Sequence, residues 1–144
     1  MKKILISTGT TEFDRLINHA VEIFDASKFA MTIQTPKKIY HAEIKSFVYI
    51  DNIKEKYKSY DLIITHAGAG NCYQLLEMNC AIIVVPNLER RDKHQKDLGL
   101  YLQTKNYCAV CWDLNDLESL IIDYEKKSFS NYSKEKFFRP DLIN

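Results

Sequence analysis

The chain has 144 residues, the size of one ordinary domain, and 46% hydrophobic with 27% charged residues is typical of a globular protein with a real core. Its 20 basic and 19 acidic side chains leave a formal net charge of +1, so no overall field attracts the protein to nucleic acid or anionic lipid. We therefore expect its specificity to come from a local site.

The N-terminal apolar run is short. Ile4-Leu5-Ile6 follows two lysines and stops at Ser7, whereas a secretory signal needs about 7–15 apolar residues and a membrane-spanning helix about 20. We therefore expect a cytoplasmic protein that reaches the cytoplasmic face of a membrane only through a partner.

Strand and helix patterns alternate along the chain, which predicts a parallel sheet covered by helices. The first half predicts a buried strand 3–7, a helix carrying Phe13, Leu16, Ile17, Ala20 and Phe24, a strand 30–34, a strand 47–50 and helical residues 53–60. The second half predicts a central strand 61–65, a short helix from the N-cap Asn71 through Met78, a strand 81–85, a helix 92–104, a strand 109–112 and a helix 114–126. We assign residues 1–127 to one Rossmann-like α/β domain, with helices on both faces of the sheet, and residues 128–144 to a C-terminal tail.

Two of the four cysteines have C-x-x-C spacing, Cys108-Ala-Val-Cys111, so zinc and redox chemistry have to be considered. The surrounding segment is typical of a strand, and residues three apart on a strand point to opposite faces of the sheet. The simpler interpretation is that both are buried thiols in a reducing compartment.

In a sheet of this type, ligands bind beyond the carboxyl ends of the strands. Three loops are expected to meet there, at residues 8–13, 66–71 and 86–95. The first contains Gly9, Thr10 and Thr11, whose hydroxyls and backbone amides at the start of a helix suit a phosphate. This turn is neither a Walker A nor a G-x-G-x-x-G motif, and a simple capped turn explains it equally well.

The second loop has the sequence His66-Ala-Gly-Ala-Gly-Asn71. Gly68, Ala69 and Gly70 leave a bare backbone at the start of a helix, which builds an anion site with room for a pyrophosphate. The alternative is a tight turn that needs its glycines only for packing. His66 stands at a strand end, where a catalytic and a structural role are both open.

The third loop is long and charged. Gln95 can both donate and accept hydrogen bonds, which suits neighbouring sugar hydroxyls, and His94 could do likewise. The alternative is a solvated loop and helix start, which is our interpretation of Arg90 and Arg91.

Taken in order, these motifs resemble a known family. Gly9-Thr-Thr-x-Phe-Asp-x-Leu-Ile17, Asp61-Leu-Ile-Ile-x-His-Ala-Gly-Ala-Gly70, Val84-Val-Pro-Asn87 and His94-Gln95 are similar to glycosyltransferase family 28. The similarity runs from about Lys3 to Leu102 and is closest to the stand-alone C-terminal half of that family. Such halves include catalytic subunits of two-part UDP-sugar transferases, of the dolichol-pathway N-acetylglucosaminyltransferase type and of the bacterial capsule and exopolysaccharide type.

The resemblance implies half of a GT-B glycosyltransferase that binds a UDP-sugar. By family pattern, the loop of Gly68, Ala69, Gly70 and Asn71 and the turn of Gly9, Thr10 and Thr11 would flank the donor diphosphate, and Gln95 with His94 would meet the donor sugar. A membrane-associated partner would bring a lipid-linked acceptor and supply the missing half of the cleft. Transfer would invert the configuration at the anomeric carbon of the sugar. The chain alone would be nearly inactive.

The sequence departs from the family pattern on the helix after the glycine loop. Gln74 stands where full-length relatives carry a ribose-binding glutamate, and a neutral glutamine forms weaker hydrogen bonds than a carboxylate does. Glu77 follows nearly one turn later and could serve the same area. This departure favours the rival hypothesis, a non-catalytic enhancer or accessory nucleotide-binding subunit.

The expected chemistry needs a base for the acceptor hydroxyl and stabilisation of the leaving diphosphate. Helix N-termini can provide the stabilisation without metal, and the chain contains no Asp-x-Asp motif, so we expect no obligatory metal or other cofactor. His66 is the best local candidate for the base, which could instead lie on the partner. The tail carries four aromatic residues that serve either to dock the partner or to pack on the domain: Phe129, Tyr132, Phe137 and Phe138.

Overall fold

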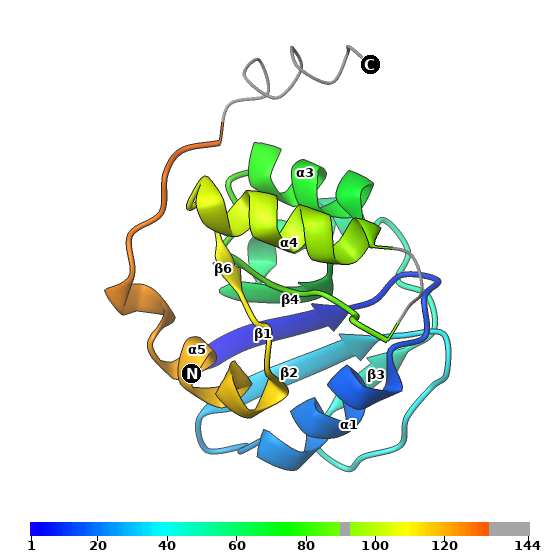
Figure 1. Cartoon of the computed structure of the whole chain (residues 1–144). Coiled ribbons are helices and arrows are strands. Elements are labelled where there is room, and N and C mark those ends of the chain that lie inside the picture. The colour runs from blue at the N-terminus through cyan, green and yellow to red at the C-terminus, as the bar shows by residue number, and fades with distance from the viewer. Residues whose placement is uncertain (90–92, 133–144) are drawn as a thin grey trace.

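The computed structural model describes residues 1–89 and 93–132, and in this part of the chain a six-stranded parallel sheet forms the centre (Figure 1). The strands are β1 (Lys2–Ser7), β2 (Phe29–Gln34), β3 (Lys45–Phe47), β4 (Leu62–His66), β5 (Ile82–Val85) and β6 (Ala109–Val110). Their order across the sheet is β3-β2-β1-β4-β5-β6. Because every neighbouring pair is parallel, all the carboxyl ends lie along one edge.

The helices cover both faces of this sheet, as predicted. They are α1 (Asp14–Ile23), α2 (Ile53–Lys56), α3 (Ala69–Glu77), α4 (His94–Thr104) and α5 (Leu117–Ile122), with short 3₁₀ turns η1 (Tyr57–Ser59), η2 (Leu114–Asp116) and η3 (Tyr124–Lys126). α1 and α5 lie on one face, and α3 and α4 lie together on the other (Figure 1). No helix in the described ranges has the length and apolar character needed to cross a membrane.

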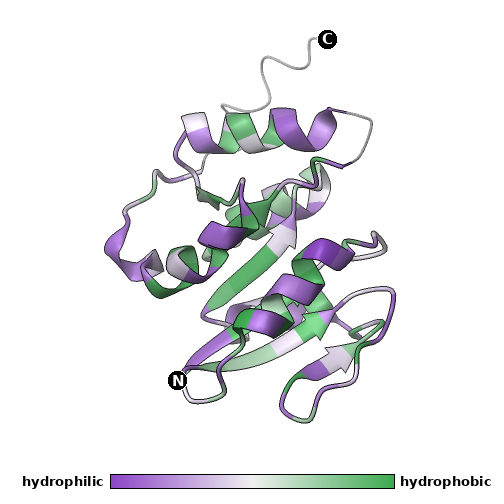
Figure 2. Cartoon of the chain, turned by 60° about the horizontal axis from the view of Figure 1, so that its bottom comes forward, coloured by the Kyte–Doolittle hydropathy of each residue, from purple (hydrophilic) through white to green (hydrophobic). Residues whose placement is uncertain are grey.

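The core is divided into two layers by the alternation of side chains along each strand. In β1, Ile4 and Ile6 pack with α1 and α5, whereas Leu5 between them packs with α3 and α4. Both faces of the sheet are therefore buried, which explains why the central strands are continuously apolar. Figure 2 shows the same arrangement, with hydrophobic strands at the centre and hydrophilic positions on the outer sides of the helices.

The predicted third strand was misplaced: β3 spans 45–47 rather than 47–50. Lys45, Ser46 and Phe47 pair with β2, although only Phe47 is strongly apolar. The more apolar residues that follow, Val48 and Tyr49, leave the sheet and are exposed. The sequence was misleading because an apolar β-branched run favours a strand, whereas here that run forms a wall of a pocket.

The helix after β4 also begins earlier than predicted. α3 starts at Ala69, and its N-cap is Gly68, whose carbonyl accepts a hydrogen bond from Cys72 N–H at 3.0 Å. The prediction of Asn71 as the N-cap was therefore wrong. Asn71 lies inside the first turn, where its side chain bonds elsewhere, and no side chain caps the helix.

The C-terminal part is more broken than the pattern suggested. The predicted helix 114–126 is divided into η2, α5 and η3, and Asp113 caps the first of these by accepting from Asn115 N–H at 2.9 Å. β6 covers only 109–110 of the expected strand 109–112, and α4 begins at His94, while Asp92 lies outside the described residues.

The two cysteines of the C-x-x-C sequence lie in opposite layers, as predicted. Cys108 packs in the layer of α3 and α4, whereas Cys111 packs in the layer of α1 and α5. Burial raises the pKa of both thiols, that of Cys111 to about 12. The pair therefore cannot act as one metal or redox site in this fold.

Candidate functional site

The site lies at the point where the strand order reverses. From β1 the chain moves outward to β2 and β3, and then returns to β4 on the other side of β1. The turn after β1 and the loop after β4 therefore lead away from each other and leave a crevice between them, which is where ligands bind in open parallel sheets.

A pocket of about 440 Å³ occupies this crevice. One part is polar and comes from the ends of β1, β2 and β4, and the other is an apolar wall from the segment after β3 and from α2 and η1. The lining residues are Ser7, Thr8, Gly9, Thr10, Thr11, Gln34, Val48, Tyr49, Ile50, Ile53, Tyr57, His66 and Asn71. The predicted meeting of the first two loops is thus confirmed in space.

The turn after β1 is shaped by Gly9 and held by Gln34. Gly9 has φ +61°, a left-handed conformation that favours glycine. Gln34 Oε1 accepts from Gly9 N–H at 2.9 Å, and Gln34 Nε2 donates to the Gly9 carbonyl at 3.0 Å. The peptide groups of Gly9 are therefore occupied by the protein itself, so Gly9 shapes the turn rather than offering its amide to a ligand.

Thr10 is better placed than Gly9 to offer a backbone donor. Thr8 N–H bonds to the Gln34 carbonyl at 3.0 Å, and Thr11 N–H bonds to the Thr8 carbonyl at 3.0 Å. Within the described ranges, Thr10 N–H has no acceptor, and Thr10 and Thr11 line the pocket.

The start of α3 supplies further donors. The N–H groups of Ala69, Gly70 and Asn71 belong to the first turn, so they have no acceptor within the helix. The positive end of the helix dipole lies at the same point. A side chain added at Gly70 would meet nothing within 4 Å, so the backbone here is open on that side.

The side chain of Asn71 is an anchor. Its Nδ2 donates to Thr65 Oγ1 at 3.2 Å, and its Oδ1 accepts from the Tyr57 hydroxyl at 3.2 Å. Tyr57 is buried, and burial raises the pKa of its phenol. Sequence reasoning missed Tyr57, because nothing in its lysine-rich segment indicates a contact with a residue 14 positions away.

His66 ends β4 and lines the pocket. Its imidazole lies directly over Gly68, with Nε2 only 2.9 Å from the position that a Cβ at Gly68 would take. Gly68 is therefore needed to leave room for this imidazole, and the ring is held at the edge of the crevice where a base could act.

The third loop is positioned differently from the prediction. Gln95 is only 7% exposed, and its Oε1 accepts from Asn87 N–H at 2.8 Å and Ala67 N–H at 3.3 Å. It joins the loops after β4 and β5 and does not line the pocket. His94 is exposed at the first position of α4, and Arg90 and Arg91 lie outside the described residues.

The two ribose candidates lie along α3. Gln74 is half-buried one turn beyond Asn71, and neither it nor Glu77 lines the pocket. Glu77 is the last residue of the helix, about 9 Å along the axis from Asn71 at a rise of about 1.5 Å per residue. The structure therefore places Glu77 outside the crevice, near Tyr132.

The apolar wall consists of Val48, Tyr49, Ile50, Ile53 and Tyr57. Tyr49 is 74% exposed, so its ring is accessible to a flat group. Thr10, Thr11 and Asn71 line the same pocket, whereas the predicted phosphate-binding residues Gly68, Ala69 and Gly70 do not line it. The pocket therefore combines a surface for an aromatic ring with a cradle for an anion. The sequence does not reveal this wall, because the apolar pattern of residues 47–50 predicts a strand.

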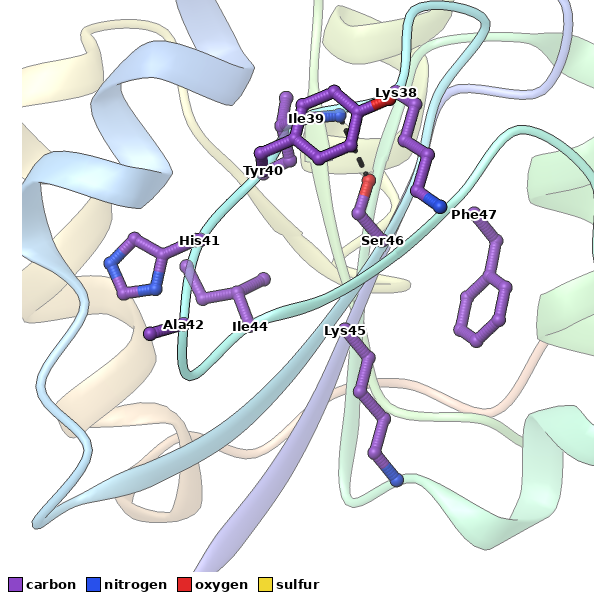
Figure 3. Close-up of a pocket in the computed structure, with 9 residues that line it drawn as sticks. All are labelled: Lys38, Ile39, Tyr40, His41, Ala42, Ile44, Lys45, Ser46 and Phe47. Carbon is purple, nitrogen blue, oxygen red and sulfur yellow. Dashed lines mark hydrogen bonds between the residues drawn. The ribbon is translucent and has the colours of Figure 1, made fainter.

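A larger and more open hollow, of about 640 Å³, lies on the outer side of the connection between β2 and β3 (Figure 3). It is formed entirely by residues 38–47, and within it the Ser46 hydroxyl accepts from Ile39 N–H at 3.0 Å. Because no other strand contributes to it, this hollow lacks the convergence of loops that marks the crevice at β1 and β4.

The described start of the tail packs on its own domain. Ser130 N–H donates to the Asn106 carbonyl at 2.7 Å. The Tyr132 ring stacks on Tyr73 with centroids 5.9 Å apart, and Phe129 lies 5.2 Å from Tyr124. This part of the tail supports the packing interpretation, while Phe137 and Phe138 lie outside the described residues.

Comparisons with known proteins identify the family and the fold of this chain. The family model described as "Glycosyltransferase family 28 C-terminal domain" matches residues 3–139. The chain is 28% identical over 125 residues to the mouse (Mus musculus) "UDP-N-acetylglucosamine transferase subunit ALG13", covering 77% of this chain but only 11% of that protein.

Solved structures show the same fold. The NMR solution structure of ALG13 matches with a TM-score of 0.63 at 15% identity, covering 90% of this chain and 88% of that one. The crystal structure of MurG from Acinetobacter baumannii matches with a TM-score of 0.62 at 19% identity, covering 85% of this chain and 42% of that one. The predicted fold, a Rossmann-like half of a GT-B enzyme, is therefore confirmed.

Proposed function

The chain belongs to the glycosyltransferase family 28 C-terminal domain family, and on that premise we propose that it is the UDP-sugar-binding catalytic subunit of a two-component inverting glycosyltransferase. The chain spans 11% of the length of the mouse relative, so the activity of the whole assembly forms part of this proposal. One observation carries it: the pocket at the β1–β4 crevice has an apolar wall and is also lined by Thr10, Thr11 and Asn71, which come from two strand-to-helix junctions.

The donor diphosphate would be held by backbone amides. Thr10 N–H and the N–H groups of Ala69, Gly70 and Asn71, which form the N-terminus of α3, have no acceptors of their own in the described part of the chain. These groups would stabilise the charge that develops on UDP as it leaves. They would do so without an obligatory metal ion, which is part of the proposal.

The uracil ring would lie against Tyr49 and Ile50 on the apolar wall. The mouse relative is named as a UDP-N-acetylglucosamine transferase subunit, so UDP-N-acetylglucosamine is the donor to test first. Gln95 and His94 remain candidates for the sugar, although the oxygen of Gln95 already accepts two backbone hydrogen bonds.

The transfer would proceed by attack of an acceptor hydroxyl on the anomeric carbon, from the side opposite to UDP. A base has to remove the hydroxyl proton, and His66 is the base candidate that this chain offers at the pocket. The second subunit would bring a lipid-linked acceptor for glycan or polysaccharide synthesis and recruit this chain to the cytoplasmic face of a membrane.

Titration with UDP and UDP-N-acetylglucosamine tests the donor site. We expect saturable binding that Tyr49→Ala weakens at least tenfold without loss of stability, because Tyr49 is exposed and lines the pocket. Tyr40→Ala is the matched control, since Tyr40 is 87% exposed but lines the other hollow. Absence of UDP binding at millimolar concentration would contradict the proposal.

An accessory, non-catalytic role is the second candidate, and Gln74 in place of a ribose-binding carboxylate favours it. Co-purification with the proposed membrane-associated subunit, followed by a transfer assay, separates the catalytic role from the accessory one. A catalytic subunit predicts turnover that His66→Ala lowers in kcat more than in KM. UDP binding with no turnover by the complex would instead support the accessory role.

A further inference from the structure

We propose that Gln34 is a positioning residue that fixes the separation between the two walls of the pocket. The two walls are the turn after β1 and the apolar wall after β3. This inference rests on the proposed function, which assigns the first wall to the diphosphate and the second to the uracil ring. Gln34 ends β2 and lies at the bottom of the crevice, between the turn after β1 and the segment after β3.

All four hydrogen-bonding positions of the Gln34 amide are used. Its Oε1 accepts from Ser7 Oγ at 2.7 Å and from Gly9 N–H at 2.9 Å. Its Nε2 donates to the Gly9 carbonyl at 3.0 Å and to the Val48 carbonyl at 2.8 Å. The side chain is only 5% exposed, so these bonds are made away from bulk water.

The chemistry of the site requires a carboxamide. Two acceptor positions and two donor positions on one planar group are available only from glutamine or asparagine among the side chains, and asparagine is one methylene shorter. A glutamate would keep the acceptors but lose both donors, so it could not bond the carbonyls of Gly9 and Val48.

The bond to Val48 matters because the sheet does not hold this residue. The last ladder contact of β3 is at Phe47, whose carbonyl accepts from Thr35 N–H at 3.1 Å. The chain then leaves the sheet, and Tyr49 and Ile50 follow directly as the apolar wall. Gln34 therefore connects this wall to the Gly9 turn across β2.

The coupling has a measurable consequence. A ligand that spans both walls gains from their fixed separation, since the protein need not order them on binding. A fragment that touches one wall gains little from it. Loss of the Gln34 bonds should therefore weaken the binding of UDP at least tenfold. The affinities for uridine and for inorganic pyrophosphate should each change less than threefold.

Gln34→Met and Gln34→Glu test this in the full chain by NMR titration. Methionine keeps the length and loses every bond, whereas glutamate loses only the two donated bonds. Thr35→Val is the matched control, because Thr35 is buried next to Gln34 and bonds to Thr8 Oγ1 at 3.0 Å but does not line the pocket. The control should lose some stability and keep its UDP affinity.

Hydrogen exchange of the ligand-free protein gives an independent readout. In Gln34→Met, the Gly9 amide should lose its protection and the signals of Tyr49 and Ile50 should shift, whereas Thr35→Val should leave both unchanged. Equal weakening of UDP and its fragments, or unchanged Tyr49 signals, would overturn the inference. If the wild-type chain binds no UDP, the proposed function fails, while the exchange data still decide whether Gln34 couples the two walls.

Discussion

The side-chain oxygen of Gln95 accepts a hydrogen bond from the backbone N–H of Asn87 at 2.8 Å. The same oxygen accepts from Ala67 N–H at 3.3 Å, so one side chain joins the loops that follow β4 and β5. Gln95 therefore holds the edge of the site together from within the protein, whatever contact it makes with a donor sugar.

Gln95→Met should lower the free energy of unfolding by about 2–6 kcal/mol, because two buried N–H groups would lose their acceptor at about 1–3 kcal/mol each. Urea denaturation measures this. Gln103→Met is the control, since Gln103 is exposed and accepts a single hydrogen bond, from Trp112 Nε1 at 3.0 Å. A Gln95→Met variant with wild-type stability and lost UDP-sugar affinity would instead mean that Gln95 acts on the sugar.

Gln95 also illustrates which features of the site can be predicted from the sequence and which cannot. Period-two and period-3.6 patterns placed the strands and helices, because both faces of the sheet are buried and apolar side chains record that burial. The parallel topology then placed the loops at one edge, and Gly9 and His66 do line the same pocket. Which side chains bond across those loops was not readable, because it depends on the relative positions of distant segments.

The site residues that the sequence does not reveal form hydrogen bonds with residues distant in the chain. Gln34 bonds to residues 25 and 14 positions away, at Gly9 and Val48, and Tyr57 bonds to Asn71 14 positions away. No local pattern marks such pairs. Conversely, residues 47–50 have a strong local strand pattern, yet Val48 and the residues after it lie outside the sheet. The Val48 carbonyl accepts a hydrogen bond from Gln34 Nε2 instead.

Gly99 of α4 lies close to Pro86, which directly follows β5, and to Trp112. A Cβ at this position would lie 2.8 Å from both Pro86 Cγ and Trp112 Cη2, which is too close without a shift of these neighbours. Gly99→Ala should therefore lower the free energy of unfolding by about 1–3 kcal/mol, as overpacking does.

Gly70→Ala is the matched control for that variant, because a Cβ there meets nothing within 4 Å. Alanine is favoured over glycine in a helix by up to about 1 kcal/mol, so this control should be neutral or stabilised. Urea denaturation of both variants checks the prediction, and equal stability would contradict the close packing at Gly99.

The hydrogen bond from Tyr57 to Asn71 connects η1 to the first turn of α3. Tyr57→Phe should lower the free energy of unfolding by about 0.5–1.5 kcal/mol. It should also weaken the binding of UDP several-fold, because the start of α3 would be held less firmly. Calorimetric titration measures the second effect. Tyr124→Phe is the control: its hydroxyl accepts from Ile82 N–H at 3.1 Å, at the opposite edge of the sheet. An equal loss of UDP affinity in both variants would show that the effect is not local to the site.

The buried thiols make stability depend on alkaline pH. Burial raises the pKa of Cys72 and of Cys111 from 9.0 to about 12, because the thiolate is poorly solvated in the core. Above pH 9 the unfolded chain releases protons that the folded chain retains. The stabilising contribution is therefore complete below pH 9 and is lost as the pH rises toward 12, by about 1.4 kcal/mol per pH unit for each thiol.

The double variant Cys72→Ala, Cys111→Ala isolates this contribution. Removing the two sulfurs should lower stability at neutral pH through lost packing, and it should also flatten the fall in unfolding free energy between pH 9 and pH 10.5. Urea denaturation across that range measures the slope. The buried phenol of Tyr124, whose pKa is also raised to about 12, has the same sign and is present in both proteins, so it cancels in the comparison. Parallel curves for the two proteins would mean that the thiols have the same pKa in the folded and unfolded states, as thiols exposed to solvent in the native state would.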